Sequence, residues 1–209
     1  DGTKDGGYLK ANWEIYETKE QLTKVSEDYG IKVIFFDGRG GPPARGGGKT
    51  HDFYASQGKT IANNKIEITI QGQTITSVFG NKDQAKYNFE QLLTAGIEND
   101  VFKNSKKDLS QKERELIEEL ANISFKKYSD LKAHPMFVPY LQEMSTLEYY
   151  GKTNIGSRPS KRGAGNEIKF EDLRAIPFVG SWSQLKQNVP GFFGFGFALH
   201  DLKKEGRFD

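Results

Sequence analysis

The sequence contains no cysteine, which excludes a disulfide framework and any metal site built on thiolates. Long apolar runs are also missing, since no stretch approaches the roughly 18 apolar residues of a membrane-spanning helix. Charge of one sign is not in excess, because 30 lysines and arginines stand against 28 aspartates and glutamates, for a net charge of +2. This near balance gives no general reason to expect a polyanion or an acidic membrane as a partner.

The 209 residues suffice for a sizeable core, and the order of predicted elements favours an α/β fold. Ser110 and Glu113 form a capping box before the clearest helical pattern. Apolar spacing predicts helices at 7–30, with Gly30 as C-cap, at 82–95, at 108–131, within 134–145 and at the C-terminal tail. Short apolar runs predict strands at 31–36, on both sides of Gly72 and at 173–182, and we expect a flexible aromatic stretch at 191–196.

The segment from Phe35 to Thr50 reads FFDGRGGPPARGGGKT, so it combines bare backbone with two arginines and ends in Gly-Lys-Thr. A nucleotide-binding loop would need the pattern G-x-x-x-x-G-K-[ST]. Its first glycine falls at Pro43, whose fixed φ and missing N–H cannot replace a glycine that cradles phosphate. This argues against a nucleotide phosphate loop.

A second interpretation is an RNA-binding segment, because GRGG and ARGGG look like Arg-Gly-Gly repeats that bind single strands. Such segments are usually long and disordered. This one is short and lies between a predicted buried strand and THDFYASQ, which is typical of an ordered helix. The small net charge also disfavours nucleic acid.

The third interpretation is an anion site in an α/β enzyme. Arg39 is expected just beyond the end of a strand, where such enzymes place their chemistry. Glycines on either side would let a ligand approach the backbone, and Arg45 follows in a segment that could move. One fixed and one mobile guanidinium suit a phosphorylated or carboxylated substrate. Arg158 and Arg174 are further candidates if they converge with Arg39.

Three segments, in this order, resemble the C-terminal half of phosphoenolpyruvate carboxylase: DGTKDGG, FFDGRGGPPARGGGKTH and GSRPSKRGAGNEIKFEDLRAIPFVGSWSQ. Members of that family carry Ser-Asp-x-x-Lys-Asp-x-Gly, then His-Gly-Arg-Gly-Gly with Arg-Gly-Gly shortly after, then Ser-Arg-Pro-x-Lys-Arg before Leu-Arg-Ala-Ile-Pro. Three long motifs in the right order are far more specific than one. The resemblance covers nearly the whole chain and is weaker over residues 80–151.

The resemblance implies a cytoplasmic carboxylating lyase that makes oxaloacetate and phosphate from phosphoenolpyruvate and bicarbonate, through carboxyphosphate and enolpyruvate. It also implies Mg²⁺ or Mn²⁺ as cofactor, inhibition by aspartate or malate, and a homotetramer. The implied fold is an eight-stranded α/β barrel with added helices. Residues 1–209 are expected to be one truncated catalytic domain, a partial barrel that is inactive alone, since the family chain is several times longer and this chain begins at Asp1.

Matching the motifs position by position implies roles for single residues. Asp1 corresponds to the family's metal-binding aspartate and Lys4 to its active-site lysine. The phosphate-binding loop is represented by Arg39, Gly40 and Gly41, and the downstream anion site by Arg158 and Arg174. Arg45 corresponds to the arginine of the mobile glycine loop, which is linked both to catalysis and to inhibitor binding.

Two positions depart from the family pattern. Asp37 replaces the histidine before Gly-Arg-Gly-Gly, which handles carboxyphosphate and CO2 in the family, and Lys186 replaces an arginine. An aspartate can still accept a proton, so Asp37 is a candidate catalytic residue, but it adds negative charge near an anionic intermediate. Two alternatives therefore stay open: a divergent homologue with a structural role, and a non-catalytic module that binds anions or RNA.

Overall fold

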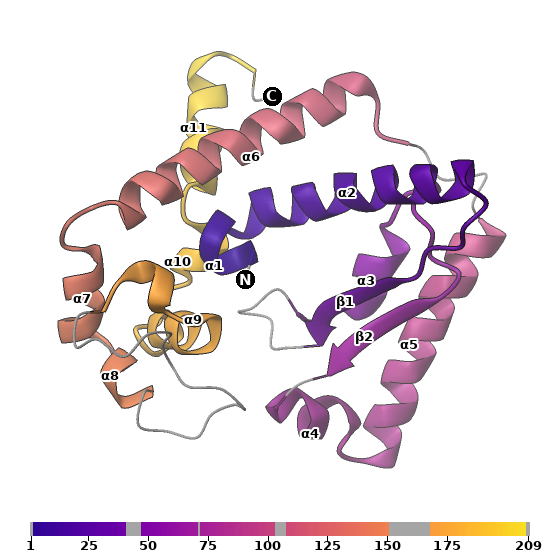
Figure 1. The fold of residues 1–209 in the computed structure, drawn as a ribbon, viewed down its shortest axis with the longest axis horizontal. Coiled ribbons are helices and arrows are strands. Elements are labelled where there is room, and N and C mark those ends of the chain that lie inside the picture. Colours follow the sequence, from indigo (N-terminus) through magenta and orange to yellow (C-terminus); the bar gives the residue numbers. More distant parts are fainter. Residues whose placement is uncertain (1, 41–46, 71, 103–107, 151–167, 208–209) are drawn as a thin grey trace. The chain divides into compact units, whose positions relative to one another are not determined.

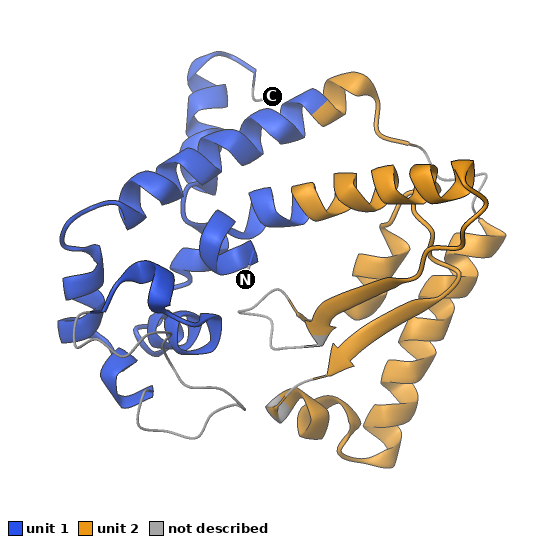
Figure 2. Cartoon of the chain, in the orientation of Figure 1, with its two compact units in different colours: residues 1–13, 115–209 blue, residues 14–114 orange. Residues whose placement is uncertain are grey.

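The computed structural model of the chain consists mainly of helices, with one small sheet (Figure 1). It describes residues 2–40, 47–70, 72–102, 108–150 and 168–207. The chain divides into two compact units, unit 1 with residues 1–13 and 115–209, and unit 2 with residues 14–114 (Figure 2). Two such units can belong to one domain, so the single domain expected from the sequence stays a prediction.

The sheet lies in unit 2 and has two parallel strands, β1 (Phe35–Gly40) and β2 (Ile66–Ile70). Phe35 lies opposite Ile66, and the register shifts between Asp37 and Gly40. Parallel strands cannot be joined by a tight hairpin, so the connection must cross over. Helix α3 (Thr50–Ala55) lies in this connection, as the sequence predicted for THDFYASQ.

Three longer helical segments complete unit 2: α2 (Tyr8–Asp28), which begins in unit 1, α4 (Gln73–Phe79) and α5 (Lys82–Val101). Both α3 and α4 pack against α5. Gly30 follows α2 with a φ of 66°, a left-handed conformation that favours glycine. Its N–H donates to the carbonyl of Glu27 at 3.0 Å, so the predicted C-cap is confirmed.

The described residues of unit 1 form helices and one bridge residue, Leu173, and contain no extended strand. The predicted capping box before α6 is confirmed, because the Ser110 N–H donates to Glu113 Oε2 at 2.7 Å and the Glu113 N–H donates to Ser110 Oγ at 3.3 Å. The elements are α1 (Gly2–Gly6), α6 (Gln111–Lys132), α7 (Phe137–Met144), α8 (Leu147–Tyr150), a 3-10 turn (Phe170–Asp172), α9 (Ala175–Gln184), α10 (Val189–Phe192) and α11 (Phe195–Lys204).

An aromatic cluster forms much of the core of unit 1. The rings of Phe137, Phe170, Phe178 and Trp182 lie with centroids 5.3 to 6.5 Å apart. Most of these pairs are tilted or edge-to-face, the arrangements that aromatic quadrupoles prefer. The cluster joins α7 to the 3-10 turn and α9, which follow it much later in the sequence.

Three sequence predictions are wrong. The strand expected after Gly72 is helix α4, and the strand expected at 173–182 is helix α9. In α9, Phe178, Val179 and Trp182 are buried together, the spacing of one helical face, and a short apolar run cannot distinguish that face from a buried strand. The stretch at 191–196, expected to be flexible, contains the end of α10 and the start of α11.

The described residues therefore form an α-rich structure in which unit 2 carries a parallel α/β element. A partial barrel is not seen in them, because they contain two strands only. Within the same ranges, no helix combines the length and the apolar character needed to cross a membrane.

Candidate functional site

Arg39 lies in β1, and not beyond the strand end as the sequence predicted. Phe35 and Asp37 share one face of β1, because side chains alternate between the two faces of a strand. The register shifts after Asp37, so Arg39 is placed by its contact with Phe53 of α3, the helix that also contacts Asp37. Phe35 and Asp37 are buried, whereas Phe36 on the other face is 68% exposed. Arg39 itself is half-buried.

Two groups hold the guanidinium of Arg39. Its central carbon lies 3.6 Å from the centroid of the Phe53 ring in α3, a close cation–π contact. One terminal nitrogen donates to the carbonyl of Gly48 at 3.4 Å. The ring and the carbonyl together restrain the plane of the guanidinium, the planar group that suits bidentate contact with an anion.

Arg39 lines a cavity of about 540 Å³ within unit 2, a size in the usual range for small-molecule sites. Lys49 adds a second cation, and Asp52 contributes a carboxylate. Apolar side chains from β2 and α4 form part of the wall, and polar groups come from α3 and α5, including Thr50, His51, Asn88 and Gln91. The cavity can therefore bind a small polar anion through few, well-placed donors.

The chain enters α3 through a tight turn beside this cavity. Gly48 has a φ of 77° and Lys49, which precedes the first helical residue, has a φ of 41°. A positive φ is uncommon for a residue with a side chain. The Gly48 conformation favours glycine, which explains one of the glycines before Lys49 and brings the Gly48 carbonyl to Arg39.

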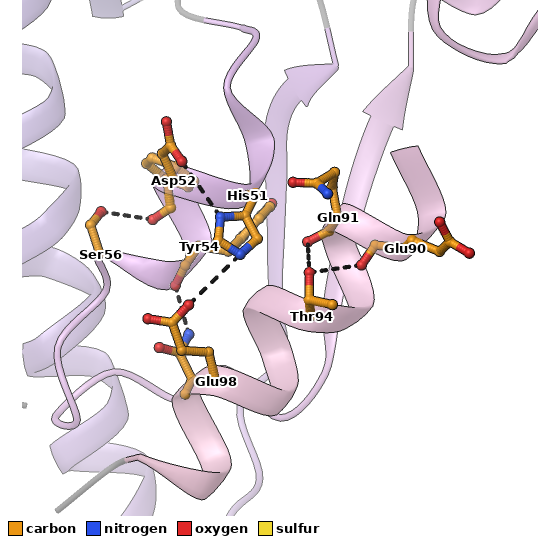
Figure 3. Close-up of polar contacts among 10 residues, drawn as sticks. His51, Asp52, Tyr54, Ser56, Glu90, Gln91, Thr94 and Glu98 are labelled. Atoms are coloured by element: carbon orange, nitrogen blue, oxygen red, sulfur yellow. Dashed lines mark hydrogen bonds and ion pairs between the residues drawn. The ribbon is translucent and has the colours of Figure 1, made fainter. Parts of the chain in front are cut away.

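His51 lines the cavity and was missed by the sequence argument. Figure 3 shows its polar contacts. Its Nδ1 lies 3.5 Å from Asp52 Oδ1, and its Nε2 lies 3.7 Å from Glu98 Oε2 in α5. A neutral imidazole donates from one nitrogen only, whereas a protonated ring can donate to both carboxylates. His51 directly follows the Gly-Lys-Thr of the glycine-rich segment, and that adjacency could have identified it.

Asp37 has a different environment from Arg39. Its carboxylate is ion-paired with Lys19 of α2, with Nζ 2.7 Å from Oδ1, and accepts a hydrogen bond from the Tyr54 hydroxyl at 3.0 Å. Burial and the neighbouring Asp37 charge raise the pKa of Tyr54 well above its ordinary value, so the hydroxyl stays protonated and donates. Asp37 is not among the described residues that line the cavity.

Lys4 lies in α1 of unit 1 and is buried. Its Nζ is 3.0 Å from Asp5 Oδ1 and 4.1 Å from the centroid of the Phe170 ring. Lys132 of α6 lies 5.1 Å from the same centroid and donates to the carbonyl of Asp5. Burial and the nearby Lys4 charge lower the pKa of Lys132, although Asp5 opposes this shift. Tyr128 donates to the Lys4 carbonyl at 2.8 Å.

Arg174 directly precedes α9 and therefore does not open a strand. Its Nε is buried and has no hydrogen-bond partner among the residues that the structure describes. Lys4 and Arg174 belong to unit 1 and Arg39 to unit 2, so their convergence stays a prediction. Gly40 ends β1 beside Arg39. The other predicted site residues lie outside the described ranges: Asp1, Gly41, Arg45 and Arg158.

The expected metal site cannot be built from the described residues. Within their ranges, no three histidine, aspartate or glutamate side chains are grouped so that they could hold a metal ion. Asp1, the ligand that the family resemblance implies, lies outside these ranges. The described cavity residues offer cations and hydrogen-bond donors that suit an anion.

Comparison with known proteins gives consistent matches. Residues 1–208 match the family model described as phosphoenolpyruvate carboxylase. Proteins with that name from Corynebacterium efficiens and Corynebacterium glutamicum are 38% and 39% identical to the chain over 207 residues. The match covers 99% of this chain and 22% of each relative, so the chain spans about a fifth of the length of these relatives.

Proposed function

Because the chain belongs to the phosphoenolpyruvate carboxylase family, we propose that a full-length protein containing it converts phosphoenolpyruvate and bicarbonate into oxaloacetate and inorganic phosphate. The family match over residues 1–208 supports this proposal. The 209 residues alone should make no oxaloacetate, because they correspond to only 22% of the length of such a relative. In the full protein, β1 and β2 would be two strands of an eight-stranded barrel.

The proposed reaction has two stages. A bicarbonate oxygen attacks the phosphorus, the bond from phosphorus to the enol oxygen breaks, and carboxyphosphate and the enolate of pyruvate form. Carboxyphosphate then splits into CO2 and phosphate, and C3 of the enolate attacks CO2 to give oxaloacetate. Negative charge is spread over the phosphoryl oxygens during the first stage, so cations fixed around the phosphoryl group would lower its barrier.

The single observation that carries this proposal is the placement of Arg39. Its guanidinium is held over Phe53 and lines a cavity of about 540 Å³ that also contains Lys49. A preorganised guanidinium can bind two phosphoryl oxygens without reorganising when charge develops. We assign Arg39 to the phosphoryl group and Lys49 to the general positive potential of the cavity.

Other roles rest on the family resemblance. Lys4, Arg158 and Arg174 would complete the anion site, and Arg45 would bind both substrate and an inhibitory dicarboxylate such as aspartate or malate. Asp1 would supply one carboxylate to Mg²⁺ or Mn²⁺, which stabilises an enolate when bound. The described residues form no such metal site. A homotetramer and a cytoplasmic location are parts of the same proposal.

Oxaloacetate formation by the full-length protein tests the function. We expect a coupled assay that follows oxaloacetate reduction to show turnover with phosphoenolpyruvate, bicarbonate and Mg²⁺ or Mn²⁺. Arg39→Ala should lower kcat/KM on the order of 10²-fold, as for loss of one preorganised donor. Arg39→Lys keeps the charge but loses the planar fork, so its loss should be smaller.

Arg207→Ala is the matched control, because it removes an exposed guanidinium that pairs with Glu119 and does not line the cavity. It should leave kcat/KM unchanged. No oxaloacetate from the unchanged full-length protein would refute the proposed function. An active protein that is indifferent to Arg39→Ala would refute the assignment of Arg39.

A further inference from the structure

Three elements of unit 2 meet at the carboxylate of Asp37. Lys19 of α2 contacts both oxygens, with Nζ 2.7 Å from Oδ1 and 2.8 Å from Oδ2. The hydroxyl of Tyr54 in α3 donates to Oδ2 at 3.0 Å. The amide of Asn99 in α5 in turn donates to the Tyr54 carbonyl at 2.6 Å. Asp37 of β1 is thus tied directly to α2 and α3, and α5 holds Tyr54 in place.

The three side chains around this carboxylate are all buried. The exposed fractions are 7% for Asp37, 6% for Lys19 and 2% for Tyr54. A buried charge is tolerated only when it is paired and hydrogen-bonded, and here both carboxylate oxygens have such partners. A proton acceptor needs an oxygen within reach of the reacting group. Asp37 is not among the described residues that line the cavity of Arg39, and its two oxygens are already engaged by Lys19 and Tyr54.

The same contacts determine where Arg39 lies. Arg39 follows Asp37 by two residues in β1, and Phe53 directly precedes Tyr54 in α3. The hydrogen bond from Tyr54 to Asp37 therefore fixes α3 against β1 next to the contact between Phe53 and Arg39. Lys19 also contacts both elements, because its Nζ lies 5.5 Å from the ring centroid of Phe53 in α3 and 5.2 Å from that of Phe35 in β1.

We propose that Lys19, Asp37 and Tyr54 form a positioning cluster that orients the guanidinium of Arg39, and that Asp37 is not a proton acceptor in the reaction. The proposal rests on the proposed function, since it assigns Arg39 to the phosphoryl group. It gives Asp37 a structural role in place of the catalytic role that its position in the motif implied. The Lys19 ammonium balances the Asp37 carboxylate, so the pair adds no net charge beside an anionic intermediate.

Exchanging both charged partners for neutral ones tests the cluster in the full-length protein. Asp37→Asn leaves the buried Lys19 ammonium unpaired, and Lys19→Gln leaves the buried carboxylate unpaired, so each should lower the apparent Tm. The double variant places two amides side by side and keeps an acceptor for Tyr54. We expect it to recover most of the lost Tm.

Activity follows the same pattern if the cluster positions Arg39. Each single variant should raise KM for phosphoenolpyruvate about tenfold, and the double variant should return KM and kcat to within about threefold of the unchanged protein. If Asp37 were instead a general base, the double variant would still lose about 10²-fold or more in kcat. Lys24→Gln, at an exposed position of the same helix, is the matched control and should change neither Tm nor KM.

Two results would overturn the cluster. Losses of Tm that simply add in the double variant would show that Lys19 and Asp37 do not stabilise each other. A double variant with restored Tm but a kcat at least 10²-fold lower would make Asp37 a proton acceptor. No oxaloacetate from the unchanged protein would instead contradict the proposed function, and the Tm comparison would still decide whether the cluster exists.

Discussion

The guanidinium carbon of Arg39 lies 3.6 Å from the centroid of the Phe53 ring, so an aromatic side chain of α3 supports the cation of β1. The ring also lies next to Lys19, whose Nζ is 5.5 Å from the same centroid. Contacts of this kind stabilise a cation by about 0.5 to 2 kcal/mol, depending on solvent exposure. Phe53 therefore contributes to the site without needing to touch a ligand.

Phe53→Leu should weaken substrate binding in the full-length protein, because leucine keeps most of the bulk but has no ring face for Arg39. A contact of about 0.5 to 2 kcal/mol corresponds to a roughly 2- to 30-fold rise in KM for phosphoenolpyruvate. Phe53→Tyr keeps the ring and should stay within about twofold of the unchanged protein on the same basis. Equal KM values for the two variants in the oxaloacetate assay would mean that the ring face is unimportant.

Tyr128→Phe should loosen the segment that carries Lys4. It removes the hydroxyl that donates to the Lys4 carbonyl at 2.8 Å and leaves that carbonyl without this donor, a loss of about 1 to 3 kcal/mol. Hydrogen exchange in residues 2–7 should become faster, and kcat/KM should fall if Lys4 is an active-site lysine. Tyr29→Phe, at a side chain that is 78% exposed, should change neither quantity.

Glu20 should make the stability of unit 2 depend on pH. Burial alone would raise the pKa of Glu20, but hydrogen bonds from Arg114 and Thr60 and the charge of Arg114 outweigh it and lower the pKa below its ordinary value of 4.5. A carboxyl whose pKa is lower in the folded state stabilises that state above its ordinary pKa, and this contribution is lost as the pH falls through the folded value.

Glu20→Gln should therefore speed amide exchange in α2 at pH 7, and the difference from the unchanged protein should shrink as the pH falls below 4.5. Free energies of local opening from hydrogen exchange, measured at several pH values, would check this. Glu90→Gln in α5 is the control, because its partner Lys86 is 3.7 Å away and both side chains are exposed. A Glu20→Gln effect that is independent of pH would contradict the ion pair.

Gly194→Ala should destabilise unit 1. Gly194 has a φ of 94°, and a Cβ built there would lie 2.3 Å from the Ser124 carbonyl oxygen in α6. The clash and the unfavourable backbone should cost about 1 to 3 kcal/mol, seen as a lower apparent Tm. Gly196→Ala is the control two residues later, because a Cβ there meets nothing within 4 Å. In a helix this alanine should be neutral or slightly stabilising.

The helices with clear local patterns were predictable from the sequence. The capping box of Ser110 and Glu113 and the left-handed Gly30 act within one or two turns, so neighbouring residues are enough to reveal them. The helices at 73–79 and 175–184 were not predictable in this way. Both segments are rich in apolar or β-branched residues, a composition that also suits a strand. Their conformation depends on packing against α5 and within the aromatic cluster, and tertiary contacts override weak local propensity.

The candidate site likewise combines residues that the sequence identified with residues that only the folded chain revealed. Arg39 was predicted because it lies in a glycine-rich segment that matches a family motif. Phe53 carries no pattern of its own, and the position of His51 after Gly-Lys-Thr says nothing about its partners. The contact of Phe53 with Arg39, and those of His51 with the carboxylates of Asp52 and Glu98, appear only in the folded chain. The predicted catalytic role of Asp37 was drawn from its position in the motif, which says nothing about its partners.

The order of three long motifs determined the family of this protein, because many residues in a given order do not recur by chance. Charge balance and cysteine content also follow from composition alone. The tertiary structure decided which charges meet. Lys19 and Asp37 are 18 positions apart and pair only because α2 packs on β1, and burial there makes an isolated charge too costly. Electrostatic partners depend on distance and burial, which exist only after the elements have packed.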